Sequence, residues 1–146
     1  MLKLISIVFL LLCVSLGCNK VNPSDLVGTW TVDDSSRHRL PVDLQKASAR
    51  MVLNANGSFT ASDMPGMFYV PPGPARLESG RGVWKLVSPS GAQQVQLTFQ
   101  EIMNQKEINV PYGTQLNISS GWFEITLYYS LGDPDEGRRV DLDKVK

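Results

Sequence analysis

Three places along this 146-residue chain carry side chains that could do chemistry. The first is His38, the single histidine, which stands in the charged run Arg37-His38-Arg39. A metal site would need further nitrogen or sulfur ligands, and nucleophilic catalysis would need a serine placed by a recognisable motif. The sequence supplies neither beside His38. We therefore expect a solvated loop histidine, with no metal, no cofactor and no catalytic residue.

The second place is the densest acidic stretch, which contains Asp133, Asp135, Glu136, Asp141 and Asp143. Calcium loops use alternating oxygen ligands with a glycine in the sharp turn. Here Gly137 comes too early for the helix-loop-helix calcium pattern, and Arg138-Arg139 bring opposing charge. The run Asp133-Pro134-Asp135-Glu136-Gly137 instead predicts a reverse turn with local ion pairing.

The third place is Cys18, which follows a short cationic start at Lys3, an apolar run from Leu4 to Leu16, and Gly17. This pattern is typical of an export signal. It resembles the signal of bacterial lipoproteins, in which the cysteine is acylated, with palmitate among the chains, and becomes the new N-terminus. The resemblance implies a signal peptide over residues 1–18, lipidation of Cys18 and a membrane-anchored position in the bacterial cell envelope.

Two alternatives to lipidation stay open. Ser15 and Leu16 stand in swapped order relative to the lipoprotein pattern, which leaves room for simple cleavage and a free secreted domain. An uncleaved membrane anchor is disfavoured because a span needs roughly 20 apolar residues.

The cysteine count agrees with lipidation. Of the two cysteines, Cys13 lies inside the expected signal, so the mature protein would keep Cys18 alone. A lone unmodified thiol in an oxidising compartment would pair or react. Acylation removes that difficulty, and no disulfide can form within the mature domain.

The size and charge of the chain limit the number of domains and the kinds of partner that it could bind. Cleavage after residue 17 or at Cys18 leaves about 128 residues, which suits one domain with one core. Acids and bases balance at 14 each, so no basic field would hold nucleic acid. We expect a short polar tether over 19–25 and a single domain over 26–146.

Beyond the tether the hydrophobic pattern has a period of two almost throughout. The Asn56-Gly57 pair predicts the turn of a hairpin over 49–61. Further strands are expected at 26–32, 80–87, 94–100, 116–118, 122–130 and 140–143. Only Val42 to Arg50 suggests a helical turn. About eight such strands, each with one apolar face, predict an all-β antiparallel barrel or sandwich.

Several short motifs resemble small bacterial proteins with a lipocalin-like barrel. They are Gly28-Thr29-Trp30 at the first strand, Asn56-Gly57-Ser58-Phe59, Gly82-Val83-Trp84 and the stretch from Tyr128 to Arg139. The resemblance implies a barrel over 26–146 with Trp30 plugging its closed end. A ligand pocket is not implied, because the C-terminal helix of true lipocalins is absent from the pattern.

The connection from Met64 to Pro74 is unusually apolar for a loop, so it must cover something or meet something. It is either a flap that completes the core or the lip of a binding site. Trp122 adjoins Phe123, and adjacent strand residues face opposite sides, which predicts one exposed aromatic. The candidate ligand- or partner-binding residues are Met64, Met67, Phe68, Tyr69 and Trp122.

These observations favour a lipid-anchored binding module for a small apolar ligand or a partner protein. The alternative is a structural, inhibitor or immunity-type lipoprotein without a small ligand. We expect no enzyme, because no two carboxylates are positioned by a hydrolytic motif.

Overall fold

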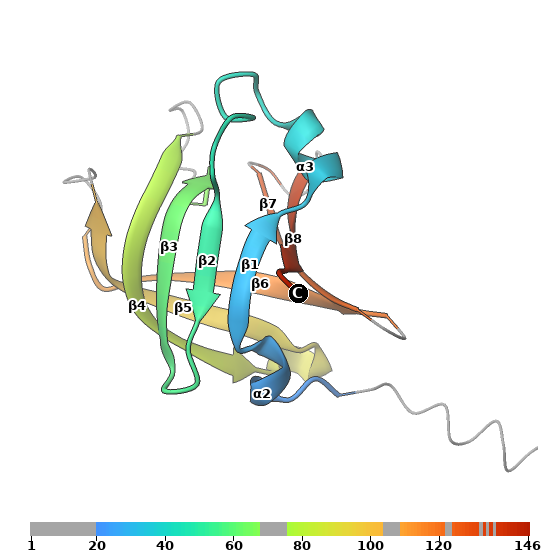
Figure 1. The fold of residues 1–146 in the computed structure, drawn as a ribbon. Coiled ribbons are helices and arrows are strands. Elements are labelled where there is room, and N and C mark those ends of the chain that lie inside the picture. The colour runs from blue at the N-terminus through green and yellow to red at the C-terminus, as the bar shows by residue number, and fades with distance from the viewer. Residues whose placement is uncertain are drawn as a thin grey trace, which may run out of the picture.

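The computed structural model describes residues 20–67, 76–103, 109–121, 124–131, 133, 135 and 137–146. Within them the chain forms a closed barrel of eight antiparallel strands (Figure 1). The all-β expectation is confirmed, and the choice between barrel and sandwich is decided in favour of the barrel. The strands are β1 (Gly28–Val32), β2 (Arg50–Leu53), β3 (Ser58–Pro65), β4 (Leu77–Val87), β5 (Gln94–Met103), β6 (Tyr112–Ser120), β7 (Ile125–Ser130) and β8 (Arg139–Lys144).

Each strand pairs with the next in sequence, and β8 returns to pair with β1. In that closing pair Trp30 lies opposite Lys144, and Val32 lies opposite Leu142. The order is therefore up-and-down, with every strand hydrogen-bonded on both sides. Closure of this kind removes the exposed strand edges through which open sheets aggregate.

Because successive strands run in opposite directions, the connections alternate between the two ends of the barrel. One end carries the short helix α2 (Pro23–Leu26), the β2–β3 turn and the 3₁₀ turn η1 (Pro89–Gly91); we call it the α2 end. The other end carries helix α3 (Asp34–Arg39) and the connections that follow β3, β5 and β7; we call it the α3 end (Figure 1).

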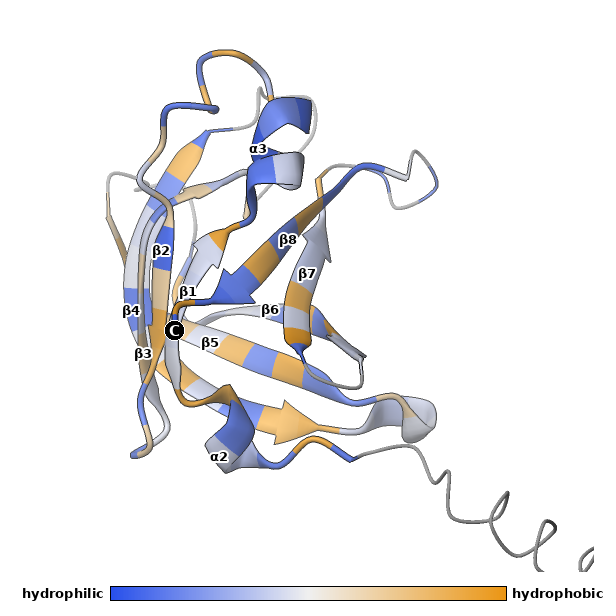
Figure 2. Ribbon diagram, turned by 45° about the vertical axis from the view of Figure 1, so that its right-hand side comes forward, coloured by the Kyte–Doolittle hydropathy of each residue, from blue (hydrophilic) through white to orange (hydrophobic). Residues whose placement is uncertain are grey.

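The core occupies the barrel interior. Along β5 the residues Val95, Leu97 and Phe99 are fully buried and alternate with outward polar residues, as the sequence predicts. Figure 2 shows this alternation as hydrophobic and hydrophilic bands along the strands. The rings of Phe59 and Phe99 meet edge to face, with centroids 4.7 Å apart. Such aromatic pairs add stability beyond the area that they bury.

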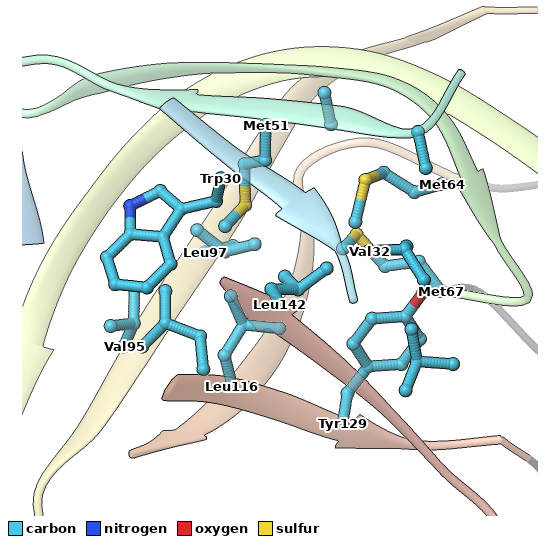
Figure 3. Packing of buried hydrophobic residues seen from close by; sticks show 14 of the residues in the cluster. Trp30, Val32, Met51, Met64, Met67, Val95, Leu97, Leu116, Tyr129 and Leu142 are labelled. Carbon is cyan, nitrogen blue, oxygen red and sulfur yellow. The ribbon is translucent and has the colours of Figure 1, made fainter. Parts of the chain in front are cut away.

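Trp30 is fully buried in this core, where it lies among Met51, Leu97 and Val95 (Figure 3). Its indole Nε1 donates a hydrogen bond to the carbonyl of Leu26, at 2.9 Å. The ammonium of Lys144 lies 6.0 Å from its ring centroid. Gly28 has φ of 144°, and a Cβ there would stand 2.6 Å from Cε of Lys144. Because residue 28 is a glycine, the Lys144 side chain has room to lie over the ring of Trp30.

Helix α3 corrects one expectation, because His38 lies in this helix and not in a loop. The Asp33 carboxylate caps the helix by accepting hydrogen bonds from the backbone N–H groups of Ser35 and Ser36. Burial alone would raise the pKa of Asp33, but these hydrogen bonds hold that pKa below its usual value. The helical turn expected from Val42 to Arg50 is also only partly right, because β2 already begins at Arg50.

Of the expected tether over 19–25, the structure describes the residues from Lys20 onward. The side chain of Val21 is buried in the core cluster, and the next residues begin α2. The chain is therefore held on the barrel from Val21.

Glycine at position 82 is required by the close approach of β4 to β5, beside an irregularity in their register. A Cβ on Gly82 would overlap the carbonyl oxygen of Thr98. We expect Gly82→Ala to lower the free energy of unfolding by about 3 kcal/mol, because the backbone itself must shift. Gly113→Ala, on β6, is the matched control, since a Cβ there meets nothing within 4 Å. Equal denaturation midpoints for the two variants would contradict this packing.

Candidate functional site

Of the five candidate binding residues, the structure places two. Met64 and Met67 are described, whereas Phe68, Tyr69 and Trp122 lie outside the described residues. Met64 belongs to β3 and is fully buried, and Met67 is buried in the same core cluster (Figure 3). Both methionines therefore belong to the core.

Met64 faces inward because the register of β3 against β4 shifts between Ala61 and Met64. Asp63, within this irregularity, has φ of 52°, an unusual conformation for a residue other than glycine. A bulge of this kind turns the strand and re-aims the residues after it. From the sequence alone, the residues from Met64 onward are predicted to form a loop, because the alternation of apolar and polar residues ends at Ala61.

Two polar groups lie buried beside these methionines. The Tyr129 hydroxyl donates a hydrogen bond to the carbonyl of Pro65, at 2.7 Å. Burial raises the pKa of Tyr129 well above its ordinary value of 10.0, and the negative charge of nearby Glu78 raises it further. Glu78 itself is buried. The sequence analysis missed Glu78, although it lies in phase with Gly80, Gly82 and Trp84 on the inward face of β4.

Several elements of the α3 end carry exposed hydrophobic side chains. Among the described residues, four such side chains belong to its loops and strand ends: Val42 (75% exposed), Leu77 (40%), Met103 (50%) and Val110 (47%). We call these four residues the apolar rim. Leu77 begins β4 and Met103 ends β5, two strands that pair with each other. The remaining exposed side chains of this kind, Val83 and Val145, belong to the outer wall and the C-terminal segment.

Helix α3 is fixed over this end by a buried polar contact to β8. The hydroxyl of Ser36 lies 3.1 Å from the Asp141 carboxylate and accepts a hydrogen bond from the Asp141 backbone N–H, at 2.9 Å. Arg139 and Arg39 form ion pairs with the same carboxylate, at 3.0 and 3.5 Å. These paired charges allow Asp141 to remain buried. The Asp141 carboxylate therefore holds α3 against β8.

The acidic run before β8 is described only at Asp133, Asp135 and Gly137. The backbone N–H of Asp135 donates to the Asp133 carboxylate at 2.9 Å, and Leu131 N–H donates to the carbonyl of Arg138. Gly137 has φ of 66°, in the left-handed region. Glu136 lies outside the described residues.

The α2 end carries an open groove of about 670 Å³, which the sequence analysis missed. Its lining comes from three distant segments: Asp25, Glu124, Ile125 and the run Asp143 to Lys146. Lys144 donates to the carbonyl of Asp25 at 2.8 Å, and Lys146 pairs with Glu124 at 3.1 Å. Burial raises the pKa of Asp143, and repulsion from Asp33 and Glu124 adds to the rise. The groove is thus lined by charges that are largely satisfied within the chain.

His38 lies exposed on α3 rather than in a loop. In the part of the chain that the structure describes, no three His, Cys, Asp or Glu side chains gather as a metal site would require. Among the same residues no helix has the length and apolar character to cross a membrane.

Comparisons with protein-family models, with curated proteins and with solved structures find no match for this chain.

Tyr129→Phe tests the buried contact with Pro65. Unfolded tyrosine ionises near its ordinary pKa of 10.0, whereas buried Tyr129 keeps its proton to a higher pH. Its contribution to stability is therefore fully present below pH 10 and is lost as the pH rises further. We expect the alkaline fall in Tm to be shallower in Tyr129→Phe than in the wild type, with a loss of about 1 kcal/mol at neutral pH.

Tyr128→Phe is the control, because its side chain is only half-buried and faces outward on the same strand. If Tyr128→Phe made the alkaline fall in Tm as shallow as Tyr129→Phe does, the assignment of this fall to the buried Tyr129 hydroxyl would be wrong.

Proposed function

We propose that this protein is a lipid-anchored, lipocalin-like barrel of the bacterial cell envelope that binds a partner protein through its α3 end. The signal pattern that ends at Cys18 supports the anchor and the location. The up-and-down order of eight strands, opened by Gly28-Thr29-Trp30, supports the lipocalin-like form. The function is one of recognition without catalysis, and it includes inhibitor or immunity-type binding.

The filled interior of the barrel is the observation that carries this proposal. An eight-stranded barrel is just wide enough for its own side chains to fill, or to hold one small ligand where the side chains are small. Here the inward positions hold large residues that are fully buried, including Trp30, Phe59, Phe99, Met51 and Leu97 (Figure 3). A ligand in the interior would have to displace them. Recognition is therefore expected at the surface.

The apolar rim favours the α3 end as that surface. Exposed apolar side chains that gather at one end of a small domain are typical of protein-binding sites. Met103 adds a flexible, polarizable side chain that adapts to a partner's surface. Around the rim, Arg39, His38 and Asp43 are exposed and would supply polar contacts.

A small apolar ligand is the second candidate, and one observation favours it. Glu78 and Tyr129 place two polar groups among buried methionines at the α3 end. Binding sites often combine an apolar lining with a few such groups. A ligand there would enter from the α3 end of the barrel, beside Met64 and Met67.

Site-specific photo-crosslinking in the native cell tests the protein-partner proposal. We expect a photoreactive residue at Met103 to form a discrete protein adduct, because this rim side chain is 50% exposed. Val83 is the matched control, since it is 44% exposed but lies on the outer wall. Adducts of equal yield at both positions, or none at Met103 and Val110, would contradict a rim that binds protein.

Anchoring is tested separately by Cys18→Ala. Without the thiol the protein has no acceptor for lipid, so we expect it to leave the membrane fraction or to keep its signal uncleaved. Cell fractionation and the mass of the mature N-terminus measure both results. Unchanged fractionation together with unchanged processing would count against lipidation.

A further inference from the structure

The chain is held on the barrel from Val21, three positions after the expected lipid attachment at Cys18. The backbone N–H of Val21 donates to the side-chain oxygen of Gln93, and the Gln93 amide donates to the carbonyl of Val21, both at 2.8 Å. One side chain thus pairs with both backbone groups of Val21, as a neighbouring strand would. The side chain of Val21 is also buried, so this residue is held by polar and apolar contacts together.

A second set of contacts holds the chain just after Val21. The N–H of Asn22 donates to the Asp25 carboxylate at 2.8 Å, which closes the first turn of α2. Leu26 ends that helix fully buried, and its carbonyl accepts the indole hydrogen bond of Trp30. The polypeptide from Val21 to Leu26 is therefore part of the α2 end.

Chain length then limits where lipid attached at Cys18 can lie. Two residues, Asn19 and Lys20, lie between Cys18 and Val21, and the three steps from one Cα to the next reach at most roughly 11 Å. The eleven residues of β4 span roughly 36 Å at the usual rise of a strand, which is about 28 Å along the barrel axis at the usual strand tilt of roughly 40°. Lipid on Cys18 cannot reach the α3 end over that distance.

We infer that the barrel stands on the membrane with its α2 end toward the bilayer and its α3 end, with the apolar rim, pointing away from it. This inference rests on the proposed lipidation of Cys18. It places the partner-binding surface where a protein can approach without meeting lipid. It also places the groove beside Lys144 and Lys146 on the membrane side.

The short link sets this orientation, because the surface at the α2 end has little attraction for lipid of its own. Among the described residues at Val21 and the groove, the basic Lys20, Lys144 and Lys146 are balanced in number by the acidic Asp25, Glu124 and Asp143. Adhesion to anionic lipid needs an excess of basic residues. A longer link should therefore release the barrel from its orientation while keeping it on the membrane.

Fluorescence quenching on vesicles tests the orientation. The full-length protein is purified in its lipidated form and reconstituted into phosphatidylcholine vesicles with spin-labelled headgroups. Two variants each offer one free thiol for a fluorophore: Ala92→Cys beside η1, and Asp43→Cys in the exposed turn after α3. We expect several-fold stronger quenching at position 92. Equal quenching, or stronger quenching at position 43, would overturn the inference.

A variant with a longer link tests whether the short link between Cys18 and Val21 causes this orientation. A flexible Gly/Ser insert of about 20 residues before Lys20 would let the ends of the link lie roughly 25 Å apart. We expect this variant to float with the vesicles as before while the difference between positions 92 and 43 shrinks. An unchanged difference would overturn the role of the short link.

Flotation separates this inference from the proposed function. A purified protein that does not float with vesicles would overturn the anchoring at Cys18 and the orientation with it. A protein that floats but shows equal quenching at the two positions would overturn the orientation alone.

Discussion

The pairing of β8 with β1 is the interaction on which the rest of the structure depends. It closes the barrel, and it sets Lys144 opposite Trp30, where the lysine covers the indole. β1 is also the strand between the two helices, since α2 precedes it and α3 follows it. The position of β1 therefore determines that α2 lies at one end of the barrel and α3 at the other.

Closure also decides what the barrel can do. With every strand paired on both sides, the inward side chains have one small space to share, and large residues fill it. The backbone edges of all eight strands are paired within the barrel. A partner can therefore be recognised only at the two ends or on the outer wall. The α2 end carries the fixed chain from Val21, and the α3 end carries the apolar rim. In our proposal the first faces the membrane and the second faces a partner.

Much of the fold could be predicted from the sequence because the alternation is regular. The inward set Val95, Leu97 and Phe99 and the Asn56-Gly57 turn are local signals, and both are confirmed. Barrel closure could not be predicted, since it depends on the pairing of strands more than 100 residues apart. Helix α3 was missed for a similar reason. Its Ser36 is held by Asp141, and six residues alone give a weak helical pattern.

The candidate site was harder to predict than the fold. An apolar run drew attention to Met64 and Met67, but the bulge after Ala61 turns them into the core. The rim residues Leu77 and Met103 come from different strands, and singly neither differs from an ordinary surface residue. The folded chain brings them to one end of the barrel, which no local pattern reveals. The groove at the α2 end is likewise built from segments that begin at residue 25 and end at residue 146.

Amide hydrogen exchange followed by NMR is the most direct test of a closed, filled barrel. If β8 pairs with β1, the hydrogen-bonded amides of these two strands should be protected to within about tenfold of those in β5, which lies on the opposite side of the ring. Amides of β1 and β8 that exchange as fast as those of exposed loops, while β5 stays protected, would show an open sheet. That result would contradict the account.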